Sequence, residues 1–250
     1  MTQFKDYFSS DPGNYKQFRP TYPQSLYDHL AAISPSTQRA WDVGCGNGQA
    51  AVELSKRFQQ VNASDASEKQ IAEAQTQINL NYHVSPAERI PAADHSLDLI
   101  TVAQAIHWFN HELFFKEVDR TLKPNGILAV WGYQLLYTNS KLDGLVEEFH
   151  SKTVGPYWPA ERALLDNSYS KIQFPYSMQS APQFQMQAQW QFSHLIGYLN
   201  TWSAVKQFEK HKGFNPVEAE LQRFKDAWGD CESSNAVFWP LILYIGKKLI

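Results

Sequence analysis

The stretch Trp41-Asp42-Val43-Gly44-Cys45-Gly46-Asn47-Gly48-Gln49 decides the fold of this 250-residue chain, because it places three alternate glycines directly after a short apolar strand. A backbone without Cβ atoms at these positions lets a bulky ligand lie against the main chain. The residues that follow predict a helix whose apolar side carries Ala51, Val52, Leu54 and Phe58. The unit is therefore a strand, a glycine turn and a helix.

A second strand, Val61-Asn62-Ala63-Ser64, ends at Asp65, seventeen residues after Gly48. A carboxylate at this place can accept hydrogen bonds from both ribose hydroxyls of a nucleoside, so turn and acid together predict a nucleotide-type ligand. The dinucleotide fingerprint G-x-G-x-x-G needs glycine where this chain has Gln49. Asp42, two residues before the first glycine, suits a ligand with an ammonium and a sulfonium better than one with a pyrophosphate. S-adenosylmethionine is such a ligand, and its product is S-adenosylhomocysteine; a glycine turn without a ligand is the alternative.

Composition limits the partners of the chain. Its formal net charge is −3 at pH 7, so no overall positive field attracts a nucleic acid. The net charge does not exclude a local basic groove. The two cysteines, Cys45 and Cys231, give neither a metal-ligand spacing nor a disulfide framework. The longest apolar run, 238–245, is too short to span a bilayer, and the first six residues lack an apolar signal core. We expect a cytoplasmic protein without membrane contact, as a monomer or a homodimer.

Strands alternate with helices as far as Trp131, which predicts an α/β fold with a doubly wound, mostly parallel sheet. Further strands are expected at 82–84, 97–102 and 127–131. Helices are expected from Gln24, after the S-x-x-Q capping box that begins at Ser67, and over 112–122. The inward side chains expected on the last two helices are Ile71, Ala74 and Ile78, and Leu113, Phe114, Val118 and Leu122.

After residue 131 the pattern changes to one that predicts a helical cap together with the last strands of the sheet. Helices are expected over 139–170, 193–212 and 216–228, and strands over 184–192 and 237–247. We expect a single structural domain with three parts. These are an N-terminal flap and first helix (1–35), a ligand-binding core (36–135) and an aromatic-rich cap with the last strands (136–250).

From Tyr15 to Trp131 the chain resembles the methyltransferase type 11 domain of the class I S-adenosylmethionine-dependent methyltransferases, and its C-terminal part is similar to the trans-aconitate methyltransferase-like subgroup. The segments that carry the resemblance are the glycine turn, Arg19-Pro20-Thr21-Tyr22-Pro23, Gln104-Ala105-Ile106-His107-Trp108-Phe109, Leu122-Lys123-Pro124-Asn125-Gly126 and Thr201-Trp202-Ser203-Ala204-Val205. The resemblance implies a Rossmann-like, seven-stranded sheet with an N-terminal flap and a C-terminal helical cap. It also implies an enzyme of class EC 2.1.1.-.

The resemblance assigns two groups of residues to the methionine part of S-adenosylmethionine. Tyr15 and Arg19 would close over it as a flap, with the guanidinium on the methionine carboxylate. Asp42 would accept a hydrogen bond from the methionine ammonium or orient the glycine turn. The cofactor set that the resemblance implies is Tyr15, Arg19, Asp42, Gly44, Cys45, Gly46, Gly48, Asp65, Ala66, Gln70, Ala87, Glu88 and Gln104.

The adenine end of this set leaves alternatives open. Ala66 and Gln70 either flank the adenine, or Gln70 serves only to cap its helix. Pro86 stands where the family often has an acid, so the adenine amino group would be contacted by Glu88 or by the backbone.

The loop after the strand at 97–102 lies where an open α/β sheet places its ligand crevice. His107 there would take a proton from the acceptor, hydrogen-bond to it, or only structure the turn, and Trp108 would form a wall near the sulfonium. His107 and His111 have the spacing of two helical metal ligands, but no third ligand is placed, so we expect no metal. The residues expected around the acceptor are Tyr133, Tyr157, Trp158 and Trp202.

These observations favour a methyltransferase that transfers a methyl group by direct displacement to a small-molecule acceptor, at a carboxylate or another oxygen nucleophile. An ionised carboxylate needs no general base, whereas an amine or a hydroxyl usually needs one. The alternatives are a nucleotide-dependent oxidoreductase, which Gln49 and Asp42 disfavour, and an S-adenosylmethionine-binding protein without chemistry of its own.

Overall fold

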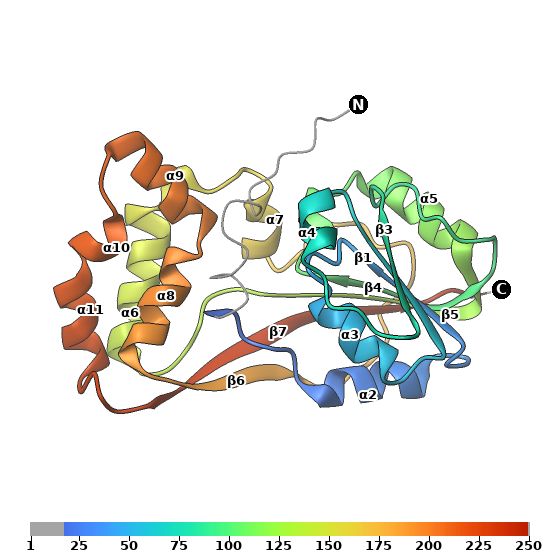
Figure 1. Cartoon of the computed structure of the whole chain (residues 1–250), viewed down its shortest axis with the longest axis horizontal. Helices are drawn as coiled ribbons and strands as arrows, with labels where there is room; N and C mark the ends of the chain where they lie inside the picture. The colour runs from blue at the N-terminus through green and yellow to red at the C-terminus, as the bar shows by residue number, and fades with distance from the viewer. Residues whose placement is uncertain (1–17, 250) are drawn as a thin grey trace.

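The computed structural model describes residues 18–249 and shows an elongated molecule with a sheet at one end and a group of helices at the other (Figure 1). Seven strands form the sheet in the order β3-β2-β1-β4-β5-β7-β6. The first five strands in this order are parallel, and β7 runs antiparallel to both of its neighbours. The strands are β1 (Arg39–Val43), β2 (Gln60–Asp65), β3 (Leu80–Val84), β4 (Leu97–Ala103), β5 (Leu122–Tyr133), β6 (Gln185–Trp190) and β7 (Asn235–Lys247). The predicted seven-stranded, mostly parallel sheet is confirmed.

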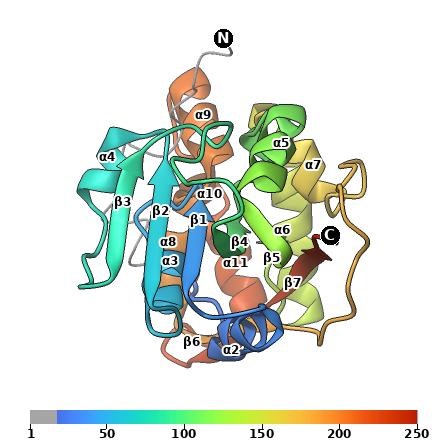
Figure 2. The ribbon, with the colours of Figure 1, turned by 90° about the vertical axis from the view of Figure 1, so that its right-hand side faces the viewer.

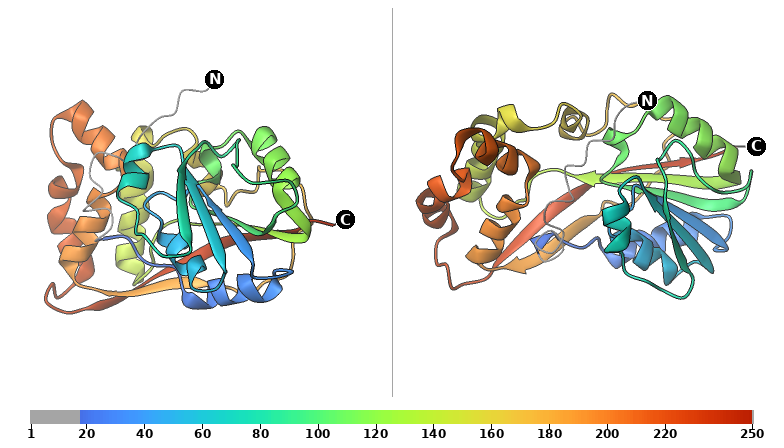
Figure 3. Two further views of the ribbon diagram at one scale, coloured as in Figure 1. Left: turned by 45° about the vertical axis from the view of Figure 1, so that its right-hand side comes forward. Right: turned by 45° about the horizontal axis from the view of Figure 1, so that its top comes forward.

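Helices cover both faces of the parallel strands, with α2 and α3 on one face and α5 on the other (Figures 2 and 3). Alternate strand residues follow this division: Ala40 packs with the α2 and α3 side, whereas Trp41 packs with the α5 side. Both faces are therefore buried, as expected for a doubly wound sheet. The α-helices are α2 (Gln24–Ile33), α3 (Gln49–Ser55), α4 (Glu68–Ala72), α5 (His111–Thr121), α6 (Ser140–Glu148), α7 (Arg162–Asp166), α8 (Phe192–Asn200), α9 (Ser203–Lys212), α10 (Pro216–Ala219) and α11 (Leu221–Trp228).

Two expected core positions are wrong. The helix that Ser67 caps ends already at Ala72, so Ile78 lies in the loop before β3 and its side chain is fully exposed, at 106%. Leu113 is 47% exposed, because α5 turns Phe114 and Val118 toward the sheet and leaves Leu113 on the outer side of its first turn.

Residues 136–234, which we call the cap, contain helices α6 to α11 and strand β6. The strand β7 connects the cap with the sheet, because its first half pairs with β6 and its second half with β5 (Figure 1). The single helix expected over 193–212 is broken into α8 and α9 at Trp202, whose backbone is extended. Thr201 supports this break, because its hydroxyl donates to the Tyr198 carbonyl at 2.6 Å instead of facing solvent. The helix expected over 216–228 is likewise divided into α10 and α11.

The helical stretch expected over 139–170 is also interrupted. After α6 come a π-helical turn, η2 (Phe149–Thr153), and a 3₁₀ turn, η3 (Gly155–Tyr157), before α7 begins. Within residues 18–249 no helix combines the length and the apolar character that a membrane crossing needs. Most of the expected flap falls outside the described residues, so the flap and the three-part division of the chain stay predictions.

Candidate functional site

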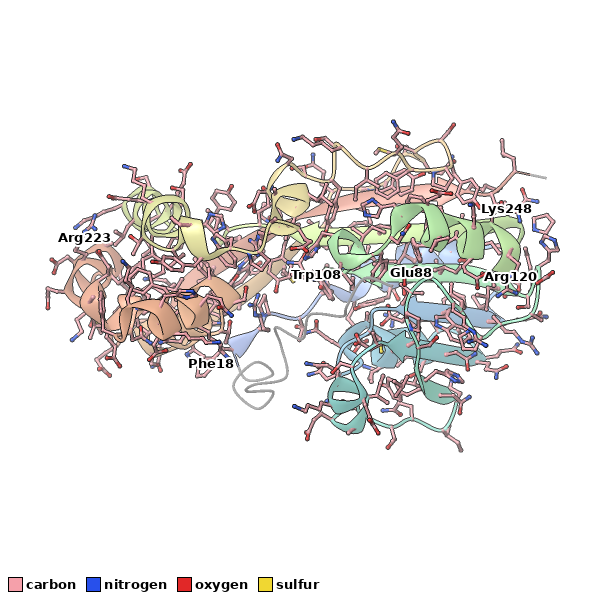
Figure 4. All side chains as sticks on the ribbon, turned by 90° about the horizontal axis from the view of Figure 1, so that it is seen from above. Phe18, Glu88, Trp108, Arg120, Arg223 and Lys248 are labelled. Carbon is pink, nitrogen blue, oxygen red and sulfur yellow. The ribbon has the colours of Figure 1, made fainter. Side chains whose placement is uncertain are left out.

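A cavity of about 640 Å³ lies at the carboxyl ends of β1, β2 and β4. Figure 4 shows where the cavity lies along the molecule, because Trp108 is one of its lining residues. Trp108 lies between Arg223 in the cap and Lys248 at the far end of the sheet. Eleven residues expected at the site line the cavity: Gly44, Cys45, Gly46, Asp65, Ala66, Gln70, Ala87, Glu88, Gln104, His107 and Trp108. Parallel strands thus bring together side chains from four separate parts of the sequence.

The glycine turn forms the floor of this cavity. Gly44, Gly46 and Gly48 all have positive φ angles, of 67°, 55° and 87°, which side chains with a Cβ rarely adopt. A Cβ on Gly44 would lie 2.7 Å from the Cβ of Ala105, and one on Gly48 would overlap the Tyr82 hydroxyl. A Cβ on Gly46, by contrast, would meet only the Gln70 side chain, at 3.7 Å, among the described residues. Gly44 and Gly48 are therefore needed for packing, while Gly46 faces the space where a ligand would lie.

Asp65 holds the turn in place at the end of β2. Its carboxylate accepts a hydrogen bond from the Gly46 backbone N–H at 2.9 Å and from the Ser67 N–H at 2.8 Å. Each carboxylate oxygen can accept a further hydrogen bond, because an ionised carboxylate offers about four acceptor positions. The side chain therefore shapes the turn and lies on the cavity wall.

Asp42 lies beneath the turn and not on the cavity wall. Its side chain is fully buried, and one oxygen accepts a hydrogen bond from the Thr101 hydroxyl at 2.8 Å. Burial raises the pKa of Asp42 to about 7, because the charged form loses its hydration, and the nearby Asp65 adds to this effect. The position supports the second of the two expected roles, orientation of the turn, better than direct contact with an ammonium.

The side of the cavity next to β3 is formed by the α4 N-terminus and the loop after β3. The backbone N–H of Gln70 donates to the Ser67 hydroxyl at 3.3 Å, which helps to close the N-terminus of α4. Gln70 also lines the cavity. Glu88 accepts a hydrogen bond from the Asn110 N–H at 2.7 Å, so it ties this loop to the start of α5. Pro86 and Ser85 also line the wall. Both expected adenine contacts, Glu88 and the backbone near Pro86, are therefore at the cavity.

The loop after β4 forms the opposite wall. Gln104 has a left-handed backbone, with φ of 57°, and its amide group both donates to and accepts from the backbone of Tyr133, at 3.0 and 2.9 Å. This clamp fixes the turn that leads into η1 (Ile106–Trp108). His107 is 6% exposed, and burial, with Arg162 and His111 adding to it, lowers its pKa to about 3. His107 is therefore neutral at physiological pH and only a weak base.

Arg19 reaches the sheet and the cap instead of lining the cavity. Its guanidinium donates to the Tyr133 hydroxyl at 3.0 Å and lies 5.1 Å from the centre of the Tyr198 ring. Tyr22 from the same segment does line the cavity. Tyr15, expected beside Arg19, lies outside the described residues.

The four aromatic residues expected around the acceptor do not line the cavity. Trp202 is 3% exposed and packs against Trp158, with ring centres 5.5 Å apart, as a core residue of the cap. Tyr157 packs on Phe208 at 5.0 Å, and Tyr133 is buried against the N-terminal segment, where it receives the bond from Arg19. The rings of Tyr157, Trp158 and Trp202 pack in the interior of the cap, because its helices bury an apolar face of their own. In this structure the four residues lie outside the cavity lining, and their expected role at the acceptor stays a prediction.

The cavity is also lined by residues that the sequence analysis did not assign to the site. Most follow a predicted residue in the chain, so inspection of the neighbours of each motif would have found them. Glu161 is different, because it lies in the cap directly before α7 and no sequence motif marks it. The unexpected residues are Tyr22, Asn47, Gln49, Ala50, Ser67, Ser85, Ala103, Ala105, Phe109, Asn110 and Glu161.

Residues 18–249 contain no group of three or more His, Cys, Asp or Glu side chains that could hold a metal ion. His111 is engaged with the carbonyl of Ile106, at 3.0 Å from Nε2, and helps to close the turn before α5.

Comparison with known proteins identifies the family. Residues 41–130 match a family model described as a methyltransferase domain, of type 11. A Dictyostelium discoideum protein named "Putative methyltransferase" is 35% identical over 255 aligned residues, which cover 99% of this chain and 97% of that protein. A probable S-adenosylmethionine-dependent methyltransferase of Saccharomyces cerevisiae is 29% identical over 132 residues, and the alignment covers 49% of this chain and 45% of that protein.

A solved structure gives the same result for the fold. The "Putative Type II Methyltransferase" of Anaeromyxobacter dehalogenans is 33% identical and superposes with a TM-score of 0.87, over 93% of this chain and 99% of that one. The strand order with an antiparallel β7 is typical of the class I methyltransferase fold. These similarities exclude the alternative of a nucleotide-dependent oxidoreductase. With this similarity along its whole length, the chain belongs to the S-adenosylmethionine-dependent methyltransferases with a type 11 domain, enzymes that take their methyl group from S-adenosylmethionine.

Proposed function

We propose that this methyltransferase acts on a small-molecule acceptor, at an oxygen nucleophile that is already ionised, with a carboxylate as the preferred group. The observation that carries the proposal is the neutral, buried His107 on the cavity wall. An imidazole whose pKa is about 3 removes a proton from a hydroxyl or an ammonium poorly. A carboxylate needs no such base. The chain is assigned by this proposal to the trans-aconitate methyltransferase-like subgroup.

The size of the site supports a small acceptor. A cavity of about 640 Å³ falls within the roughly 300–1,000 Å³ that small-molecule sites occupy, and it has to take both donor and acceptor. The net charge of −3 argues against a polyanion such as a nucleic acid. The two cysteines are unpaired, which fits action in a reducing cytoplasm, as a monomer or a homodimer.

The residues at the cavity fit the methyl donor. Asp65 would receive the ribose hydroxyls, Gly46 leaves room for the donor against the backbone, and Ala66, Gln70 and Glu88 would surround the adenine. We keep Tyr15 and Arg19 as the expected flap over the methionine carboxylate. When bound, the donor supplies a methyl group already activated on a sulfonium sulfur. The protein's own contribution is to align the acceptor oxygen and to exclude water.

A two-stage experiment tests the proposal. Thermal shift with S-adenosylmethionine, S-adenosylhomocysteine, NAD and NADP should show stabilisation by the first two only. A panel of small carboxylic acids, amines and alcohols is then incubated with S-adenosylmethionine, and methylated products are identified by mass spectrometry. We expect methyl esters from one or more acids. Turnover only of amines or alcohols would contradict the proposal of an ionised oxygen nucleophile, and binding without any turnover would favour a binding protein.

A further inference from the structure

Behind His107 lies a tyrosine that the sequence motifs did not mark. Ser168 and Tyr169 follow α7 and both have left-handed backbones, with φ angles of 53° and 57°. Such conformations are costly for residues with a Cβ and persist where the surrounding structure holds them. Here Gln134 holds the turn, because its side-chain amide donates to the Leu165 carbonyl at 3.0 Å and to the Asp166 carbonyl at 2.8 Å.

This strained turn directs the Tyr169 ring into the wall behind the cavity. Tyr169 is 2% exposed, and its ring lies nearly parallel to that of His107, at 22° with centres 6.2 Å apart. A Cβ on Gly132 in β5 would lie 2.7 Å from the Tyr169 hydroxyl, so the glycine leaves space for that hydroxyl. The hydroxyl then lies 3.5 Å from Nδ1 of His107, which is its partner within the described residues.

The direction of this hydrogen bond follows from the two groups. Burial raises the pKa of the Tyr169 hydroxyl, so it keeps its proton, and burial holds His107 neutral with a single ring N–H. If that N–H were on Nδ1, the buried O–H of Tyr169 would have no acceptor, which is the costlier arrangement. The O–H therefore donates to Nδ1, and the ring proton of His107 lies on Nε2. Among the described residues Nε2 has no hydrogen-bond partner. It is also absent from the side-chain polar atoms that are both buried and unpartnered, so Nε2 is not completely buried.

We propose that Tyr169 is a positioning residue that fixes His107 as the Nε2–H tautomer, so that His107 offers a hydrogen-bond donor, and not a base, to the acceptor in the cavity. The proposal rests on the oxygen nucleophile proposed above. One carboxylate oxygen of the acceptor accepts the Nε2–H bond, and this orients the other oxygen toward the methyl group. His107 neither gains nor loses a proton in the transfer.

The tautomer can be read directly by nuclear magnetic resonance, without an acceptor. Long-range proton–nitrogen correlation of the ¹⁵N-labelled full chain at pH 7 separates protonated from unprotonated ring nitrogens, and a His107→Gln sample assigns the His107 signals among the eight histidines. We expect Nε2 protonated and Nδ1 unprotonated in the native protein. Tyr169→Phe should produce a visible fraction of the Nδ1–H form. Tyr176→Phe is the matched control, because that hydroxyl, in the same connecting segment, bonds Asp119 at 3.1 Å on the surface.

An Nδ1–H tautomer in the native protein, or a Tyr169→Phe spectrum identical to the native one, would overturn the proposal. The native spectrum decides even if Tyr169→Phe does not fold. With an acid from the panel that reacts, Tyr169→Phe should raise KM about two- to tenfold, the range of one neutral hydrogen bond, and lower kcat less. Equal loss in Tyr176→Phe would contradict a local role. If no acid reacts, the carboxylate assignment fails, while the tautomer is still decided by the spectrum.

Discussion

The sheet side and the cap side of the cavity are built in different ways. On the sheet side, short segments at the carboxyl ends of parallel strands place their polar groups toward one space, as with Asp65 on the glycine turn. On the cap side, the aromatic residues pack against one another, and Glu161 is the one cap residue of the described chain that lines the cavity. The sheet side is thus a binding surface, whereas most of the cap is a second core.

The largest effect that separates the two regions is expected from Trp202→Ala. Trp202 is 3% exposed and its ring packs against Trp158, Phe149 and Tyr198. Removal of such a side chain lowers the free energy of unfolding by about 3–5 kcal/mol, measured by urea denaturation. Affinity for S-adenosylhomocysteine, measured by calorimetry under folding conditions, should stay the same. Phe214→Ala, at an exposed cap position, is the control. A large loss of affinity with little loss of stability would instead support a role for Trp202 in ligand binding.

Asp42→Asn should change how stability depends on pH. The pKa of Asp42 is raised from its ordinary 3.8 to about 7, so the folded state keeps this proton at pH values where the unfolded state has released it. The resulting stability is complete below pH 3.8 and is lost as the pH rises through 7, by up to roughly 4 kcal/mol. Asparagine has no proton to lose, so the variant should gain stability relative to the native protein between pH 4 and 7.5. A difference that does not vary with pH would contradict this reasoning.

Gly46→Val tests the floor of the cavity. Its Cβ would point into ligand space, so the affinity for S-adenosylmethionine should fall roughly a hundredfold, or about 2.7 kcal/mol. The positive φ adds a stability cost of about 1–2 kcal/mol, so a fold check by circular dichroism accompanies the calorimetry. Gly48→Val should instead destabilise the protein, because its Cβ overlaps Tyr82. Retained binding by a folded Gly46→Val protein would move the ligand away from the turn.

Asp65→Ala should weaken binding of S-adenosylmethionine by about 1.5–3 kcal/mol, the range of hydrogen bonds to a charged group. Part of this loss comes from the turn, because the carboxylate also accepts the Gly46 N–H. Calorimetry of Asp65→Asn separates the two parts, since the amide oxygen can keep one backbone bond. Unchanged affinity in Asp65→Ala would remove the residue from the site.

The two regions also differ in how far the sequence predicts them. The glycine turn and Asp65 could be found because a strand, its turn and the next strand end are local patterns that always meet at one edge of a parallel sheet. The position of Trp202 could not be predicted in this way, because it depends on the break between α8 and α9, which only the packing of the cap determines. Tyr169 depends in the same way on a left-handed turn that Gln134 holds from a distant part of the chain.

Glu161 should give the smallest effect, and it tests whether the cap takes part in choosing the acceptor. It lies directly before the five-residue helix α7 and lines the cavity. Its negative charge opposes an anionic acceptor, so Glu161→Gln, which keeps the shape and removes the charge, should lower KM for a reactive carboxylate. The expected change is about two- to fivefold, or roughly 0.5–1 kcal/mol for charges several ångströms apart in a partly hydrated cavity. Glu147→Gln, an exposed position on α6 in the same cap, should leave KM unchanged. A higher KM in Glu161→Gln would instead mean that this carboxylate holds the acceptor through a hydroxyl or an ammonium group, and the cap would then be a binding surface as well as a core.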